Sequence, residues 1–172
     1  MIVPEDTYGV FVCFTKHPNL HIVARNIVHL TAIVAPYSSE LRVYNCPIFV
    51  RFQSRAATKI HAIRCRALET IHGANIIDLW VLGCMNLTTI NVPAVRTIHM
   101  NACSSFISLT SDTVLHVFVV VCENLVKLIA PNATDIHVNR CCSLRSIVAP
   151  LATKAHINAC GEIEELTLPA QD

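Results

Sequence analysis

The amino-acid sequence predicts a mainly β solenoid, built from stacked turns of 19 residues with a parallel strand sheet. Two observations lead to this fold class. An apolar segment with period two comes before a recurrent cysteine, and apolar residues follow that cysteine at its third and sixth positions, as in "CENLVKLIAP" (122–131). The cysteines recur every 19 residues without an insertion or deletion, and they are Cys46, Cys65, Cys84, Cys103, Cys122, Cys141 and Cys160.

The alternating segment is the first strand of each turn. In one middle turn Leu79 and Val81 flank Trp80, so a period of two places the aliphatic residues inside and the indole outside. Beyond a corner, Leu87 and Ile90 form a second inward face, and proline often ends it because proline has no amide N–H for a further ladder bond. Nineteen residues leave no room for a helix as well, so we expect short strands and turns throughout.

The repeat covers nearly the whole chain and predicts one solenoid domain over residues 1–172. We expect about nine turns, with a degenerate first turn over 1–21 and regular repeats over 22–172. A single turn cannot bury its own apolar side chains. The stability of the fold must therefore come from stacking each turn on its neighbours.

Composition narrows the possible functions. The chain has 172 residues, of which 53% are hydrophobic and 15% are charged, against roughly 25% charged residues in an average soluble domain. Part of the surface must then be apolar, and such a surface usually has a partner. A net charge of +1 argues against nucleic-acid binding. The longest apolar run, residues 117–122, is too short to cross a membrane, and the first residues show no secretory signal.

The repeat resembles the leucine-rich repeat. "CENLVKLIAP" (122–131), "CCSLRSIVAP" (141–150) and "CMNLTTINVP" (84–93) are similar to the Cys-x-x-Leu-x-x-Ile/Leu-x-x-Pro phrases of its short, cysteine-bearing variants. The resemblance covers about residues 20–170 and implies ligand binding on a concave strand face. The period is shorter than the usual range of about 20–29 residues, and Ile and Val replace Leu in the strand. A plain two-sided parallel β-solenoid is therefore the alternative.

The cysteine ladder predicts a buried column of thiols. Zinc sites need clustered ligands, and a 19-residue spacing does not cluster them. Side chains in an in-register ladder also point the same way, which fits the torsion of a disulfide badly. We therefore expect no bound metal and no cofactor. Nine cysteines kept as thiols indicate a reducing compartment, cytoplasmic or otherwise intracellular.

Two outward columns of the first strand, four and two positions before each cysteine, form the candidate partner face. Trp80, the only tryptophan, is its expected anchor. Equivalent histidines in this face mostly lie two turns apart, whereas His137 and His156 are on adjacent turns and could share a metal or an anion. The predicted face comprises Arg42, Tyr44, His61, Ile63, Trp80, Leu82, His99, Asn101, Phe118, Val120, His137 and Asn139.

The sequence predicts a binding protein and not an enzyme. It has four glycines and none of the common phosphate-loop, serine-hydrolase or zinc-protease motifs, so no catalytic residue is proposed. The expected function is a scaffold that binds another protein on the outward strand face. The alternative is a structural subunit of a larger assembly, such as a virion, a coat or a polymer. Such a subunit would associate end to end through the unpaired strand edges of an open solenoid.

Overall fold

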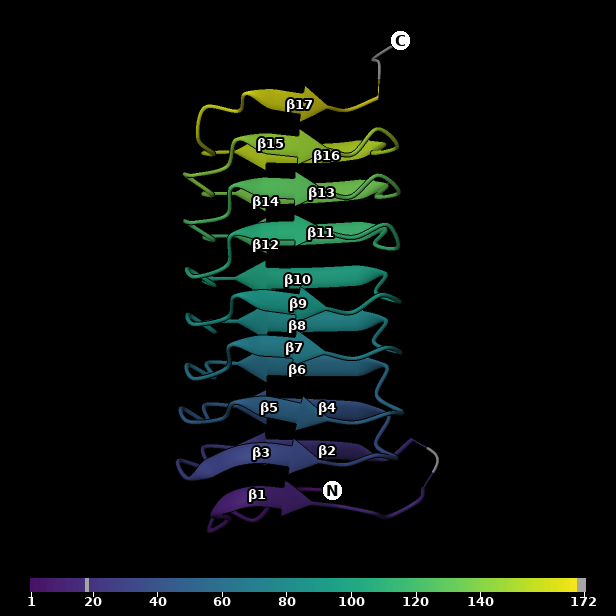
Figure 1. Cartoon of the computed structure of the whole chain (residues 1–172), viewed down its shortest axis with the longest axis vertical. Coiled ribbons are helices and arrows are strands. Elements are labelled where there is room, and N and C mark those ends of the chain that lie inside the picture. Colours follow the sequence, from purple (N-terminus) through teal and green to yellow (C-terminus); the bar gives the residue numbers. More distant parts are fainter. Residues whose placement is uncertain (18, 170–172) are drawn as a thin grey trace.

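The computed structural model describes residues 1–17 and 19–169 as a rod of stacked turns (Figure 1). Within these residues the regular structure consists of 17 strands, and there is no helix. The strands run across the rod, and successive turns climb along its length from the N-terminal to the C-terminal end. The mainly β solenoid predicted from the sequence is confirmed.

One face of the rod is a single parallel sheet of eight strands in the order β16-β14-β12-β10-β8-β6-β4-β2. Each strand has five residues, and each residue pairs with the residue 19 positions later, as Leu79 does with Ile98. The strands are β2 (His21–Arg25), β4 (Glu40–Tyr44), β6 (Lys59–Ile63), β8 (Asp78–Leu82), β10 (Thr97–Asn101), β12 (His116–Val120), β14 (Asp135–Asn139) and β16 (Lys154–Asn158).

The other face is also parallel, but it is divided into three sheets. Their orders are β1-β3-β5, β7-β9 and β11-β13-β15-β17. The strands are β1 (Gly9–Val12), β3 (Leu30–Val34), β5 (Arg51–Gln53), β7 (Thr70–His72), β9 (Thr89–Asn91), β11 (Ser108–Thr110), β13 (Lys127–Ile129), β15 (Ser146–Val148) and β17 (Glu165–Thr167). Strands on both faces give about eight turns of a two-sided parallel β-solenoid, the arrangement named above as the alternative to the leucine-rich repeat.

The first turn is less regular than the others, in keeping with its degenerate sequence. On the first face it contributes only an isolated bridge between Ile2 and Val23. On the second face β1 pairs with β3, but the register shifts between Gly9 and Val10. From β2 onward the first-face pairing proceeds without such a shift.

The core is the space between the two faces. The inward positions of the first strand, such as Leu79 and Val81, are fully buried, and so are the inward residues Leu87 and Leu128 beyond the corner. Since every turn supplies equivalent side chains, the core is one continuous apolar column along the rod. In the last described turns the column is more open: Ala155 and Leu166 are exposed although the pattern predicts that they face inward.

The cysteine column lies at one corner of this core. Six of the seven ladder cysteines are buried, whereas Cys160, in the last described turn, is half-buried. The Cys84 Sγ lies 3.5 Å from the Ala62 carbonyl of the preceding turn and 3.9 Å from the Leu82 carbonyl, in weak hydrogen bonds that recur along the ladder. Burial raises the pKa of the Cys141 thiol to about 12, so that this thiol stays protonated.

A left-handed residue precedes each ladder cysteine and turns the chain at that corner. Gly83 has φ of 67°, and the non-glycine residues at this position have φ between 49° (Ala159) and 57° (Asn26). Glycine and asparagine adopt this conformation at little cost, whereas a β-branched side chain adopts it only with strain. Val121, at φ 54°, is therefore the most strained residue of the series.

We expect Val121→Asn to stabilise the protein by about 1 kcal/mol, because asparagine enters the left-handed region at lower cost than valine. The matched control is Val126→Asn, since Val126 is also a surface valine but has an ordinary backbone conformation. Urea denaturation of the three proteins measures the effect. An unchanged or lower midpoint for Val121→Asn, relative to the Val126→Asn control, would show that the corner is not strained.

We also expect thiol labelling of the native protein to follow burial. Cys142 is exposed and should react with maleimide first, whereas Cys84 and Cys103 are fully buried and should react only after denaturation. Mass spectrometry of the labelled peptides measures the order. Fast labelling of Cys84 or Cys103 in the native state would place the ladder on the outside.

Candidate functional site

The central outward column of the eight-stranded sheet is a continuous stack of rings. The ring-centroid distances along it are 5.7 Å for His61–Trp80, 3.8 Å for Trp80–His99, 4.5 Å for His99–Phe118, 6.3 Å for Phe118–His137 and 5.9 Å for His137–His156. The middle rings are close to parallel, with an angle of 4° between His99 and Phe118. An aromatic pair of this kind contributes about 0.5–1.5 kcal/mol beyond the area that it buries.

Trp80 points outward, on the side opposite to Leu79 and Val81, as strand alternation requires. It is half-buried because His61 and His99 stack on it from the two neighbouring turns. Its Nε1 donates a hydrogen bond to Asp78 Oδ1 at 2.8 Å, which fixes the indole in one orientation. Because the rings cover each other's faces, the column presents mainly ring edges to the outside.

All the residues of the predicted face lie on the outer side of this one sheet, on strands β4 to β14. They are half-buried, except Asn101, which is exposed. The column two positions before the cysteines is apolar at Ile63, Leu82 and Val120, is interrupted by Asn101 between Leu82 and Val120, and has Asn139 toward the C-terminal end. The stack thus runs beside a second, mainly apolar column.

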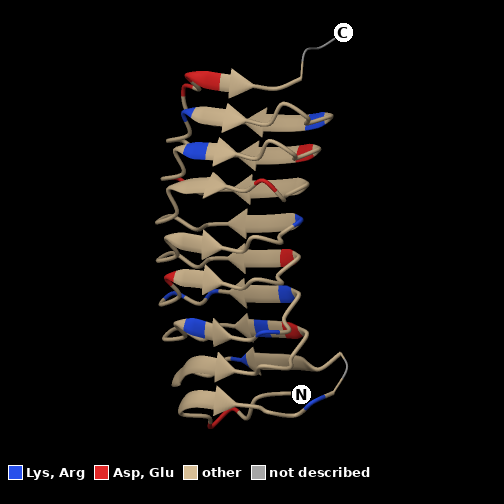
Figure 2. Ribbon diagram, turned by 45° about the vertical axis from the view of Figure 1, so that its right-hand side comes forward, with Lys and Arg blue, Asp and Glu red and all other residues tan. Residues whose placement is uncertain are grey.

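A third outward column, at the first residue of each strand, carries most of the charge on this face. Glu40, Lys59 and Asp78 follow one another on β4, β6 and β8, and Asp135 pairs with Lys154 farther along. Opposite charges on neighbouring strands stabilise a sheet, whereas like charges would repel. Figure 2 shows these charges at the ends of the strands, while the middle of the sheet carries few of them.

A buried carboxylate, which the repeat pattern did not predict, lies at one end of the ring stack. Glu40 is 4% exposed, and its side chain lies 2.7 Å from Arg42 Nε, 2.9 Å from His21 Nδ1 and 3.7 Å from His61 Nε2. Burial by itself would raise the pKa of Glu40, but the Arg42 hydrogen bond and the nearby positive charges outweigh it and hold the pKa below its ordinary value. The predicted face residue Arg42 is thus engaged by Glu40.

Two imidazoles within the stack have lowered pKa values. Burial lowers the pKa of His61, and Arg42 adds to that effect, while Glu40 and Asp78 oppose it. Burial is also the main cause of the lowered pKa of His99, opposed by Asp78. Both rings are therefore held in the neutral form, which suits stacking between other rings.

The described residues contain no group of three or more His, Cys, Asp or Glu side chains arranged to hold a metal ion. His137 and His156 do meet on adjacent strands, with ring centroids 5.9 Å apart. Nor does the described part of the chain include a helix that is long and apolar enough to cross a membrane.

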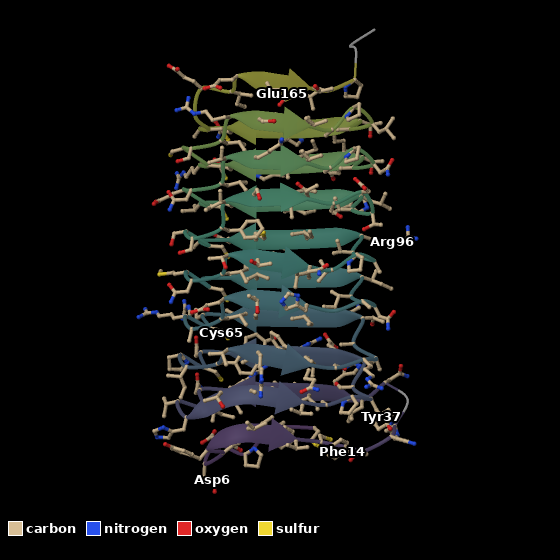
Figure 3. All side chains as sticks on the ribbon, viewed as in Figure 1. Asp6, Phe14, Tyr37, Cys65, Arg96 and Glu165 are labelled. Carbon is tan, nitrogen blue, oxygen red and sulfur yellow. The ribbon has the colours of Figure 1, made fainter. Side chains whose placement is uncertain are left out.

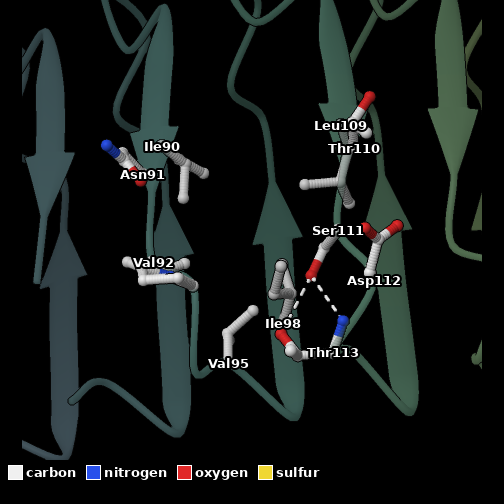
Figure 4. Close-up of a pocket in the computed structure, with 11 residues that line it drawn as sticks. Ile90, Asn91, Val92, Val95, Ile98, Leu109, Thr110, Ser111, Asp112 and Thr113 are labelled. Carbon is white, nitrogen blue, oxygen red and sulfur yellow. Dashed lines mark hydrogen bonds between the residues drawn. The ribbon is translucent and has the colours of Figure 1, made fainter. Parts of the chain in front are cut away.

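A hollow of about 330 Å³ lies on the second face, where β9 and β11 are not paired (Figure 4). Its floor includes the buried residues Val95 and Ile98, and its rim is polar. The Ser111 hydroxyl at this rim accepts hydrogen bonds from the amides of Thr113 and Val114, so the turn itself satisfies it. The sequence did not predict this break in the sheet.

Comparison with known proteins identified no relative of this chain. No protein-family model matches the chain. No curated protein matches it, and no solved structure does. The likeness to the leucine-rich repeat thus remains one of sequence motif, and the fold rests on the strand pairing described above.

We expect the protein to lose stability as the pH falls through the ordinary histidine value of 6.5. With their lowered pKa values, His61 and His99 bind protons less readily in the folded state than in the unfolded chain, so acid favours unfolding. Glu40, also with a lowered pKa, loses its contribution in a separate window, as the pH falls through and below 4.5.

Denaturation midpoints between pH 7.5 and about 5.5 measure the histidine effect. The double variant His61→Gln/His99→Gln should show a flatter decline than the parent protein. Phe118→Leu is the matched control, because it disturbs the same stack without removing a titratable group, and it should keep the steeper decline. Equal slopes for the parent and the double variant would contradict the assignment.

Proposed function

We propose that this chain is a protein-interaction scaffold that binds a partner protein on the outward face of its eight-stranded sheet, centred on Trp80. The observation that carries the proposal is the ring stack with its apolar neighbours Ile63 and Leu82 on a continuous, in-register sheet. Tryptophan is enriched among the residues that dominate binding at protein interfaces. Such a face offers apolar area for burial against a partner, at about 25 cal/mol per Å².

Preorganisation supports the proposal. Binding normally costs about 0.5–1.5 kcal/mol for each flexible side chain that it immobilises. Trp80 is already held by Asp78 and by its two stacking neighbours, so most of this cost is met in the free protein. The outer edges of the aromatic rings carry the positive rim of the aromatic quadrupole. These edges match a partner that presents carbonyl or carboxylate oxygens among apolar groups.

The remaining expectations agree with this role. All nine cysteines are free thiols, which supports the proposal that the protein works in a reducing, intracellular compartment. The scaffold needs no cofactor and no metal for such binding. We propose no enzymatic activity, no nucleic-acid binding and no membrane binding.

A second candidate function is a subunit of a larger assembly, and the N-terminal turn is the observation that favours it. Ile2 is 77% exposed, Tyr8 80% and Phe14 66%, so this end of the rod is apolar. Large exposed apolar patches commonly mark interaction sites. Native mass spectrometry separates the two candidates, because polymers that grow with concentration favour the assembly and a monomer favours the scaffold.

We expect Trp80→Ala to weaken partner binding by about 2 kcal/mol or more, as loss of a central anchor does. The folded state should lose only the stacking contribution of about 0.5–1.5 kcal/mol for each ring pair, since the indole lies outside the core. Ile107→Ala is the control, because Ile107 is an exposed apolar residue away from this sheet.

The measurement is a quantitative affinity capture with the parent and both variants, followed by titration of the partner that the parent recovers. The partner should be lost with Trp80→Ala and kept with Ile107→Ala. Equal recovery by Trp80→Ala and the parent, with both proteins folded, would exclude this face as the binding site.

A further inference from the structure

A second hollow lies at a corner of the rod, away from the ring stack. It has a volume of about 320 Å³ and lies where β1, β3 and β5 end. Three successive turns line it: Phe14 from the first, Pro36 and Tyr37 from the second, and Gln53 and Arg55 from the third. Figure 3 shows Phe14 and Tyr37 at this same corner.

Two aromatic side chains at this hollow are unusually exposed. Phe14, which follows β1, is 66% exposed, and Tyr37, which follows β3, is 41% exposed. Exposed aromatic surface in a concave site gains free energy when a ligand covers it. Val34 and Pro36 beside them extend the apolar lining, so the hollow can receive a flat apolar group.

The same corner carries positive charge that no carboxylate neutralises. Lys16 Nζ lies 5.0 Å from the centre of the Tyr37 ring, and Arg55 lines the hollow. Among the described residues, neither cation has a carboxylate oxygen within 4.0 Å, and no acidic residue lines the hollow. Asp6 belongs to the same first turn, but it lies at the opposite corner of the rod (Figure 3).

We propose that this hollow binds a planar aromatic anion, such as a nucleoside monophosphate or an aromatic carboxylate. The ring packs against Phe14 and Tyr37, and the anionic group lies toward Arg55 and Lys16. Arginine suits this role because its planar guanidinium offers several donors to a phosphate or a carboxylate. The amide of Gln53 supplies further donors and an acceptor at the rim for ring substituents.

The first test distinguishes the contribution of the ligand's aromatic ring from that of its anionic group. Calorimetric titration compares AMP with adenosine and with inorganic phosphate, and salicylate stands for an aromatic carboxylate. We expect AMP or salicylate to bind at least tenfold more tightly than adenosine or phosphate alone, because only the former contact both the rings and the cations. Preference for AMP identifies a nucleotide site, and preference for salicylate identifies a carboxylate site. If neither binds below about 1 mM, the proposal is wrong.

The second test measures how tightly variants of the protein bind whichever of the two probes, AMP or salicylate, binds the parent more tightly. Phe14→Ala should weaken that probe at least fivefold. Arg55→Gln should weaken that probe to a similar extent, and when the probe is AMP it should bring the affinity close to that of adenosine. Arg66→Gln is the control, since Arg66 is also an exposed arginine but does not line the hollow, and it should have no effect. All three side chains are outside the core, so circular dichroism should show an unchanged fold. Equal losses with Arg66→Gln and Arg55→Gln would indicate unspecific charge attraction and overturn the proposal.

Discussion

The structure depends on one constraint, the in-register pairing of each residue with the residue 19 positions later. On the eight-stranded face this register is unbroken from His21 to Asn158, so every side chain faces its own equivalent at about the 4.8 Å strand spacing. Residues at equivalent positions of neighbouring turns must therefore be compatible with each other. Apolar side chains meet this requirement in the core and stacked rings meet it on the outer face, whereas charged side chains meet it where their signs alternate from strand to strand. A single inserted residue would move every inward side chain of its strand to the outer face.

The corners show how the constraint is met where the chain leaves the sheet. A left-handed residue follows each first-face strand and turns the chain inward. From β4 onward the next residue is a ladder cysteine, whose thiol donates weak hydrogen bonds to backbone carbonyls of the same and the preceding turn, as Cys103 does. At the opposite corner, Gly73 makes room for Ile76, because a Cβ on Gly73 would lie 2.3 Å from Ile76 Cδ1. Ala130 and Ala133 occupy the same two positions in another turn.

The 19-residue period predicted on which side of its strand each residue lies, but it did not predict side-chain conformations. It placed Trp80 outside, Cys84 inside and the predicted face on one sheet, because alternation along a strand depends only on the backbone. It did not predict that the rings stack, because stacking depends on side-chain rotamers. It also missed the burial of Glu40, which results from Arg42 and His21 closing over one carboxylate. The period also did not predict the division of the second face into three sheets. The strands on either side of each break have three residues, and strands this short pair through so few hydrogen bonds that the period alone does not determine whether they pair.

The inward and outward columns differ in how much their residues vary from turn to turn. The ladder position keeps cysteine through seven turns, whereas the central outward position holds Arg42, His61, Trp80 and Phe118 among others. The backbone tolerates this variety because outward side chains do not enter the core. The ring stack contributes to stability as well as to the proposed partner face, since each middle ring stacks on two neighbours and an end ring on one. Substitution at an end of the stack, such as at His156, therefore costs the fold less than substitution in its middle.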